Sequence, residues 1–354
     1  MRSTLNFVHK DFGGYMKRFN VAVVGATGMV GNKFLEVLEE RHLPVDNYYL
    51  FASAKSAGKK IEFAGKEHTV IELTEDNVKN LKGKVDFALF SAGASVSEKF
   101  APIFVEIGAT VVDNSSKWRM YDDVPLVVPE VNPEDVKYSK GIIANPNCST
   151  IQAVVALKPL YDAFGIKRVV YSTYQAVSGA GVQGYNDLKD GINGVAPKKF
   201  PHPIAYNMLP HIDVFMDDGY TKEEWKMVVE TRKILHDKNM RITATTVRVP
   251  VFYGHSESIN VEFVQNCTKD DIVKVLEKAD GIVVMDDPKN AVYPTPLIAQ
   301  NHDEVFVGRI RKDDSVKSGA NLWVVADNIR KGAATNAVQI VELLIKNTTK
   351  KQEA

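Results

Sequence analysis

Cys148 is the residue of this sequence whose type and surroundings best suit covalent chemistry. It lies in the run Asn-Pro-Asn-Cys-Ser-Thr (residues 145–150), and a stretch with helical spacing of apolar residues follows. A helix N-terminus stabilises negative charge, so we expect a lowered pKa and a thiolate at this position. Asn147 and Ser149 are residues that cap such an end. A free cysteine is more often a small, buried apolar side chain. The polar loop that caps this helix is a poor position for such a side chain. Cys267 has no such surroundings, and we interpret it as structural.

Three glycines indicate a second site. Gly25, Gly28 and Gly31 lie between an apolar, β-rich run (residues 19–24) and a stretch of helical periodicity (residues 32–41). Glycine permits the tight turn and the close approach of a pyrophosphate, and the helix N-terminus presents unpaired N–H groups to it. A glycine triplet alone is weak evidence, but its place between a strand and a helix favours a dinucleotide site over a structural turn.

The residues after the second predicted strand (48–52) indicate which dinucleotide binds. An acidic side chain here would take the ribose hydroxyls of NAD. This chain instead has Lys55 and Ser56, which suit the 2′-phosphate of NADP. The sequence therefore favours NADPH as the cofactor, and a solvated loop lysine is the structural alternative.

A thiol beside a nicotinamide indicates one chemistry above others. A thiolate adds to an aldehyde, a hydride passes to NADP⁺, and a thioester remains for water or phosphate to resolve. Such a reaction also needs an acid/base group close to the thiol.

The motifs around these residues resemble those of the aspartate-β-semialdehyde dehydrogenase family over residues 17–346. The matching segments are, in chain order, GATGMVG (25–31), NSSKWRM (114–120), NPNCST (145–150), TYQAVSGAG (173–181), EEWKM (223–227), VRVPV (247–251), GHSES (254–258) and ANLW (320–323). Several long motifs in the same order are more specific than any one of them.

The resemblance implies a role for each matching residue around the thiol. Cys148 would be the acyl-thioester nucleophile, Gln175 would orient the substrate, and His255 would be the general acid/base. Arg248 would hold the substrate α-carboxylate in a bidentate fork, and Glu223 would pair with the α-ammonium. Structural alternatives are an ion pair for Arg248 and a core or loop role for His255.

The resemblance also implies the remaining ligands. Arg119 and Lys226, assisted by Asn147, would form the phosphate site. Spacing alone makes Glu223 and Lys226 an ordinary surface pair one helical turn apart, and Arg119 could instead stack on the neighbouring tryptophan. The implied cofactor positions are Thr27, Gly28, Met29, Val30, Lys55, Ser56, Ser178, Gly179 and Asn321, beside Gly25 and Gly31.

The implied activity is the NADPH-dependent reduction of L-aspartyl 4-phosphate to L-aspartate 4-semialdehyde and phosphate. In the family this step leads toward lysine, threonine, methionine and diaminopimelate, and it requires no metal. One position departs from the family pattern, because Lys55 replaces the usual arginine. A lysine lacks the planar guanidinium that binds a phosphate through two hydrogen bonds. Use of both NADPH and NADH therefore stays open.

Three rival functions use other features of the sequence. Tyr185 and Lys189 have the Tyr-x-x-x-Lys spacing of short-chain dehydrogenases, with Ser172 upstream, but this assignment leaves Cys148 without a role. N-acetylglutamyl-phosphate reductase shares the thioester chemistry, although its substrate has no ammonium for Glu223. A non-catalytic module that senses NADPH is the third.

Two different sheets must position these residues. Strands alternate with helices up to residue 148, which predicts a Rossmann-type, doubly wound parallel sheet. Longer strands then predict a second α+β domain with a mixed, largely antiparallel sheet. We therefore predict an N-terminal extension (1–15), an NADP-binding domain (16–148), a catalytic and dimerisation domain (149–329) and a C-terminal helix that packs back on the first domain (330–354).

Two local expectations accompany this division. The helix after Cys148 should end at Pro159, and the last helix should span residues 333–346. Residues 178–210 are a stretch rich in Gly and Pro to which the sequence assigns no element.

Composition limits the class of protein. The 354 residues contain 44 Lys and Arg and 44 Asp and Glu, with 45% hydrophobic residues. A net charge of zero does not suit nucleic-acid binding, and no apolar run approaches the roughly 20 residues of a membrane span. With two cysteines and no export signal, we expect free thiols and a cytoplasmic location. As in the family, we expect a homodimer, and a tetramer stays open.

Overall fold

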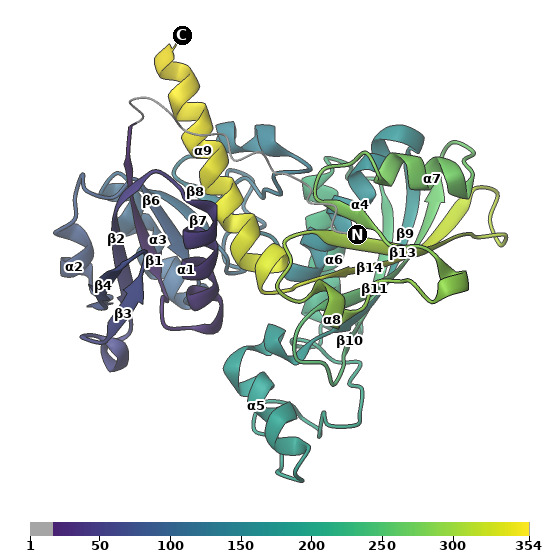
Figure 1. Cartoon of the computed structure of the whole chain (residues 1–354), viewed down its shortest axis with the longest axis horizontal. Helices are drawn as coiled ribbons and strands as arrows, with labels where there is room; N and C mark the ends of the chain where they lie inside the picture. The colour runs from purple at the N-terminus through teal and green to yellow at the C-terminus, as the bar shows by residue number, and fades with distance from the viewer. Residues whose placement is uncertain (1–16, 354) are drawn as a thin grey trace.

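A computed structural model describes residues 17–353 of the chain, with side chains as far as residue 348. The predicted N-terminal extension lies outside these residues. Two lobes, each built on one sheet, are joined by the last helix, α9 (Thr335–Glu353), which runs from one lobe to the other (Figure 1).

The first lobe contains a parallel sheet, as predicted. Its strands, in spatial order, are β5 (Ile71–Glu72), β2 (Val45–Ala52), β1 (Phe19–Val24), β6 (Phe87–Phe90), β7 (Thr110–Asp113) and β8 (Ile142–Ala144), and every neighbouring pair is parallel. α1 (Met29–Arg41) and α9 pack on one face. α2 (Glu75–Lys79) and α3 (Ala94–Glu106) pack on the other. A hairpin of β3 (Lys60–Phe63) and β4 (Lys66–Thr69) follows β2.

The second lobe contains the mixed sheet. Its order is β10 (Arg241–Arg248), β9 (Ile166–Gln175), β11 (His255–Phe263), β14 (Gly319–Ala326), β13 (Val305–Lys312) and β12 (Ile282–Val284). The pairs β9–β10 and β12–β13 are parallel and the other three are antiparallel. The fold class is confirmed: a doubly wound parallel sheet and a second, largely antiparallel α+β unit.

Helices cover one face of the mixed sheet. α4 (Cys148–Phe164), α6 (Lys222–Ile234) and α7 (Lys269–Leu276) bury their apolar faces there. α4 contacts β9, β11, β13 and β14, so the helix that begins at Cys148 lies across the middle of the sheet. α8 (Pro296–Ala299) packs beside β14. Residues 17–353 include no helix with the length and apolarity needed to cross a bilayer.

Two local predictions were wrong. α4 does not end at Pro159 but continues to Phe164, and Gly165, with a φ of 65°, is its C-cap. Its first ten residues beyond Cys148 are almost all buried, and this packing outweighs the one hydrogen bond that a proline removes. The stretch 178–210, to which the sequence assigned no element, contains α5 (Gly181–Gly191), which projects away from both sheets (Figure 1).

The second difference concerns the end of the chain. The last helix begins later and ends later than predicted, and a turn of π-helix (Arg330–Ala334) precedes it. Single π-helical turns are uncommon and are frequent at functional sites. This turn lies beside the start of α4, which makes it part of the site described next.

Candidate active site

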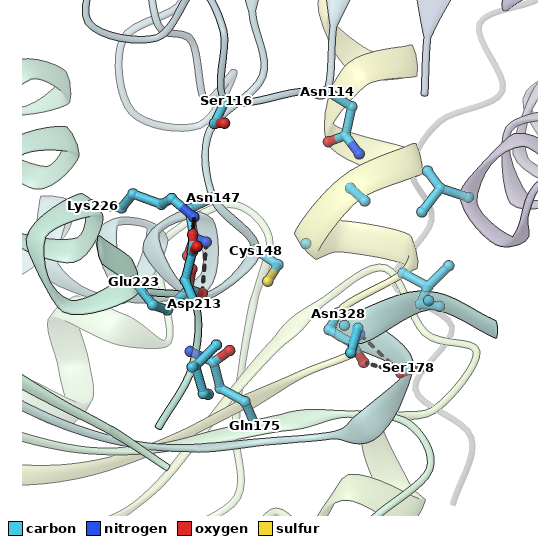
Figure 2. Close-up of a pocket in the computed structure, with 18 of the residues that line it drawn as sticks. Asn114, Ser116, Asn147, Cys148, Gln175, Ser178, Asp213, Glu223, Lys226 and Asn328 are labelled. Carbon is cyan, nitrogen blue, oxygen red and sulfur yellow. Dashed lines mark hydrogen bonds and ion pairs between the residues drawn. The ribbon is translucent and has the colours of Figure 1, made fainter. Parts of the chain in front are cut away.

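A cavity of about 440 Å³ opens between the two lobes and brings most of the predicted residues together. Its lining residues that the sequence had singled out are Met29, Val30, Arg119, Asn147, Cys148, Gln175, Ser178, Gly179, Glu223, Lys226 and Arg248. Figure 2 shows Cys148 near the centre, with Glu223 and Lys226 on one side and Ser178 and Asn328 on the other. The nucleophile candidate therefore lies between two groups of polar side chains.

The start of α4 positions Cys148. Asn147 is the N-cap, and its side-chain oxygen accepts hydrogen bonds from the backbone N–H groups of Ser149 (3.0 Å) and Thr150 (3.3 Å). The cap holds the first turn so that the thiol points into the cavity. Gly332 of the π-helical turn lies behind it, where an added Cβ would be 3.0 Å from the Cys148 Cβ.

His255 lies against the thiol. Its Nε2 is 3.2 Å from the Cys148 Sγ, and its Nδ1 accepts a hydrogen bond from the backbone N–H of Ala176 at 3.0 Å. Because Nδ1 is the acceptor, the proton of the neutral ring is on Nε2, which faces the sulfur. Burial, and then the positive charge of Arg248, lower the pKa of His255 well below its usual value. The ring is therefore a neutral hydrogen-bond donor to the sulfur at physiological pH.

The surroundings of Cys148 do not lower its pKa as expected. Burial, and then the negative charge of Glu223, raise the pKa of Cys148 to about 12, against the opposing charges of Arg248 and Arg119. These effects outweigh the favourable end of the helix. At neutral pH the pair is thus a thiol and a neutral imidazole.

One row of the mixed sheet forms the floor of the cavity. Gln175 and Arg248 are register partners at the ends of β9 and β10, and His255 begins β11 beside them. The Arg248 Nη1 donates a hydrogen bond to the Ala176 carbonyl at 2.6 Å, while its buried Nε has no hydrogen-bond partner among the described residues. A buried guanidinium with an unused donor suits an incoming carboxylate.

α6 brings charged groups to one wall. Its first turn is held by a capping box between Thr221 and Glu224. Glu223 accepts hydrogen bonds from Asn147 Nδ2 (2.8 Å) and from Lys226 Nζ (3.1 Å). Burial alone would raise the pKa of Glu223, but the Lys226 charge and these hydrogen bonds lower it. The pair is one helical turn apart, as its spacing indicated, yet it lines the cavity.

Arg119 is held by a residue that the sequence analysis missed. Its Nε and Nη2 donate to the carbonyls of Asn145 and Asn114, and its Nη1 donates to the Glu230 carboxylate at 3.1 Å. Glu230 also accepts the Asn147 backbone N–H at 2.7 Å. This buried carboxylate thus fixes both Arg119 and the residue before the nucleophile. Arg119 does not stack on Trp118, whose ring instead lies beneath Lys117.

The glycine turn is shaped for a pyrophosphate. Gly25 has a φ of +89°, and a Cβ on Gly31 would lie 2.0 Å from the Gly25 carbonyl oxygen, so both positions require glycine. Gly28 is the N-cap of α1 and provides no side-chain cap, which leaves the first N–H groups of the helix available to an anion. These features fit a dinucleotide.

The remaining cofactor candidates include four polar side chains. Thr27 and Ser56 are joined by a 3.4 Å hydrogen bond between their hydroxyls, and Lys55 lies exposed between the second strand and β3, in the 3₁₀ turn Ala54–Ser56. Ser178 lines the cavity and accepts a hydrogen bond from the Asn328 side chain at 3.0 Å.

Asn321 does not lie with the other cofactor candidates. Its side chain accepts a hydrogen bond from Asn260 within the mixed sheet at 3.1 Å, and it does not line the cavity. Asn328, seven residues later in the run DNIRKG, lines the cavity instead. The position of that run, just before the last helix, is the signal that could have identified it.

Further lining residues were missed by the sequence analysis: Asn114, Ser116, Lys199 and Asp213. Each lies in an irregular segment where no periodicity points to a buried face. The rival Tyr185 packs against Phe252 and Tyr253, at ring distances of 4.7 and 5.8 Å, and does not line the cavity. A tyrosine-based mechanism therefore has no support from this geometry.

Comparisons with known proteins identify the family of the chain. A family model described as the NAD binding domain of semialdehyde dehydrogenase matches residues 20–139, and one described as its dimerisation domain matches residues 157–331. The aspartate-semialdehyde dehydrogenase of Aquifex aeolicus is 60% identical over 337 residues, which are 93% of this chain and 98% of the relative.

Solved structures of similar fold carry the same family name. Aspartate semialdehyde dehydrogenase II from Vibrio cholerae, complexed with ASA, has a TM-score of 0.89 and 50% identity, covering 93% of this chain and 99% of that one. The Candida albicans enzyme, solved with NADP, has a TM-score of 0.72 and 29% identity, with coverages of 93% and 98%. The chain belongs to the aspartate-semialdehyde dehydrogenase family.

Proposed function

We propose that the protein reduces L-aspartyl 4-phosphate with NADPH to L-aspartate 4-semialdehyde and phosphate, through a thioester on Cys148. The observation that carries this proposal is the contact of 3.2 Å between the Cys148 Sγ and the His255 Nε2, in a cavity that also presents Arg248 and Glu223. The reaction would supply the biosynthesis of lysine, threonine, methionine and diaminopimelate.

Each charge of the substrate has an opposite partner in the cavity. Arg248 would bind the α-carboxylate and Glu223 the α-ammonium, while Arg119 and Lys226 would bind the phosphate. Gln175 and Asn147 also line the cavity; Gln175 would orient the acyl carbon toward the sulfur, and Asn147 would assist the phosphate site. An ammonium beside Glu223 would also neutralise the charge that raises the Cys148 pKa, so the substrate itself would ease the loss of the thiol proton.

The sulfur then attacks the acyl carbon, the bond to the phosphate oxygen breaks, and the thiol proton leaves with the phosphate. NADPH, when bound at the glycine turn of α1 and beside Ser178, Gly179 and Asn328, supplies the hydride that reduces the thioester. As the carbon–sulfur bond of the resulting thiohemiacetal breaks, the Nε2–H of His255 donates a hydrogen bond to the departing sulfur. The sulfur takes the Nε2 proton of His255, which a proton from solvent replaces, and the aldehyde leaves.

NADPH is proposed over NADH because Lys55 and Ser56 follow the second strand without an acidic residue, and the Ser56 hydroxyl meets that of Thr27 in the glycine turn. We further propose a cytoplasmic homodimer, supported by the match to a dimerisation domain.

Steady-state kinetics in the reverse direction test the assignment. Oxidation of aspartate semialdehyde with NADP⁺ should depend on phosphate, and Lys226→Ala and Arg119→Ala should raise the KM for phosphate. Glu223→Ala should lower kcat/KM for aspartate semialdehyde, whereas a preference for N-acetylglutamate semialdehyde would point to the related reductase. Equal rates with and without phosphate would contradict the proposal.

A further inference from the structure

Asp213 is a cavity carboxylate that the proposed reaction leaves without a role. It lies in the segment that leads to α6 and has a φ of 68°, in the left-handed region that aspartate tolerates better than most residues. Its Oδ1 accepts a hydrogen bond from the neighbouring Val214 N–H at 3.0 Å, and its Oδ2 accepts one from Lys226 Nζ at 2.7 Å. Figure 2 shows Asp213 on the same side of Cys148 as Glu223, Asn147 and Lys226.

Lys226 is therefore shared between two carboxylates. Its ammonium contacts Asp213 at 2.7 Å and Glu223 at 3.1 Å, and the lysine side chain is only 12% exposed. Burial would lower its pKa, but the charges of Glu223 and Asp213 raise it, so Lys226 remains an ammonium. An anion that approaches this ammonium meets two negative charges already in place.

The two carboxylates differ in how firmly they are held. Glu223 is 7% exposed, and its other oxygen accepts the Asn147 side-chain amide, which caps α4. Asp213 is 33% exposed, and its other oxygen contacts only the backbone of the next residue. Movement of Asp213 breaks no contact with another element except the one to Lys226. It is thus the partner that an incoming anion can displace.

We propose that Asp213 is an internal competitor of phosphate, whose carboxylate holds the position at Lys226 Nζ that a phosphate oxygen takes. The inference rests on the proposed function, in which Lys226 binds phosphate. The Asp213 carboxylate and a phosphate would repel each other if both lay beside Lys226, and both would compete for the hydrogens of its ammonium. In the reductive direction the return of Asp213 to Lys226 would favour release of phosphate once the thioester has formed. Asp213 would therefore set the affinity of the enzyme for phosphate.

The charge of Asp213 is present across the working pH range. Burial would raise its pKa, but the hydrogen bond and charge of Lys226, the Val214 N–H and the charge of Lys222 lower it. Competition of this kind should consequently weaken phosphate binding at any pH near neutrality, without acting as a pH switch.

The test is the reverse reaction of the full-length chain, with inorganic phosphate varied at saturating aspartate semialdehyde and NADP⁺. Asp213→Asn keeps the shape and removes the charge, and it should lower the KM for phosphate about fivefold to tenfold while the KM for the aldehyde stays within about twofold. Asp217→Asn makes the same charge change in the same segment, at an exposed side chain with no hydrogen bond or ion pair to the described residues, and should leave both constants unaltered.

Two results separate the possible failures. An unchanged or higher KM for phosphate in Asp213→Asn, with a raised KM in Lys226→Ala, would overturn the role of Asp213 and leave the phosphate site intact. An unchanged KM in Lys226→Ala would instead contradict the phosphate site itself. If Asp213→Asn turns over too slowly to assay, the dissociation constant for phosphate can be taken from the rise of its melting temperature with phosphate concentration. A constant lower than that of the parent protein supports the proposal, and an equal or higher one overturns it.

Discussion

Glu223 opposes the ionisation of Cys148, although both residues belong to the same cavity. After burial, its charge is the largest effect that raises the pKa of the thiol, to about 12. The thiol is therefore protonated at neutral pH, and in the proposed reaction a substrate ammonium beside Glu223 would lower the Cys148 pKa.

This electrostatic coupling can be measured by alkylation. Glu223→Gln removes the negative charge, so the pKa of Cys148 should fall and its rate of reaction with iodoacetamide at pH 8 should rise, about tenfold for each unit of pKa. Mass spectrometry of the Cys148 peptide gives the rate. Glu98→Gln, a surface change on α3, is the control for net charge. A rate in Glu223→Gln equal to or below that of the parent would show that Glu223 does not govern the thiol.

At the residue scale, sequence motifs predicted many of the groups that face the cavity, but not Asp213, which also lines it, nor Glu230, which holds Arg119. Cys148 and His255 have distinctive neighbours in the chain. A lone acidic residue on a helix or in a loop has none, and its pattern indicates an exposed position unless its partner is known. The sequence could not predict the raised pKa of Cys148 for the same reason, because Glu223 lies beside Cys148 only in the folded chain.

At the scale of elements, the π-helical turn before α9 is the feature that a local pattern could not predict. A π-turn has no distinct sequence period, and here it depends on contacts from both lobes. The Gly332 N–H donates to the Asp327 carbonyl at 3.1 Å, which holds the glycine against Cys148. By contrast, the sequence predicted the strand, the glycine turn and the helix around α1. The turn leaves no room for a Cβ at Gly25 or Gly31, so glycine at these positions is a reliable signal.

Gly332→Ala tests whether this turn positions the nucleophile. The added Cβ would lie 3.0 Å from the Cys148 Cβ and would displace Cys148 by a few tenths of an ångström. Because misplacement of reacting atoms is costly in rate, kcat should fall about tenfold, with little change in melting temperature.

Gly191→Ala is the matched control, since its Cβ would meet only the Ala205 Cβ at 3.4 Å. Full activity in Gly332→Ala, measured in the same assay, would show that the turn does not constrain the nucleophile.

At the scale of the whole molecule, a charge network joins the two lobes behind the cavity. Arg330 contacts Glu40 of α1 and Asp303 of the second lobe, with 2.8 Å between its Nε and Asp303. Arg41, at the end of α1, contacts Asp303 at 3.6 Å and Glu342 of α9 at 2.7 Å. The division of the chain into two kinds of sheet was predictable from strand spacing. The network was not, because its members are separated by up to 301 positions in the chain.

Asp303→Asn should weaken this junction in a pH-dependent way. Burial would raise the pKa of Asp303, but hydrogen bonds from Arg330 and Thr335 and the nearby arginine charges lower it. A carboxylate with a lowered pKa stabilises the fold above its unfolded-state value of about 3.9, and it loses this contribution as the pH falls through the lowered value. The variant should therefore melt roughly 2–6 °C below the parent at pH 7, and the difference should vanish in strong acid.

Differential scanning calorimetry at several pH values gives these melting temperatures. Asp314→Asn, which removes only an exposed ion pair with Lys312, should change the melting temperature little at any pH. A constant difference between Asp303→Asn and the parent down to strong acid would show that the charge of Asp303 does not stabilise the junction.

The covalent step on Cys148 is the central claim, and it can be observed directly. The enzyme is mixed with aspartate semialdehyde and NADP⁺ without phosphate, quenched in acid, and digested for mass spectrometry. A burst of NADPH should accompany one aspartyl group on the peptide that contains Cys148; phosphate should remove the group, and Cys148→Ala should show neither signal. A burst of NADPH without an acyl group on Cys148, or turnover by Cys148→Ala, would contradict the thioester mechanism.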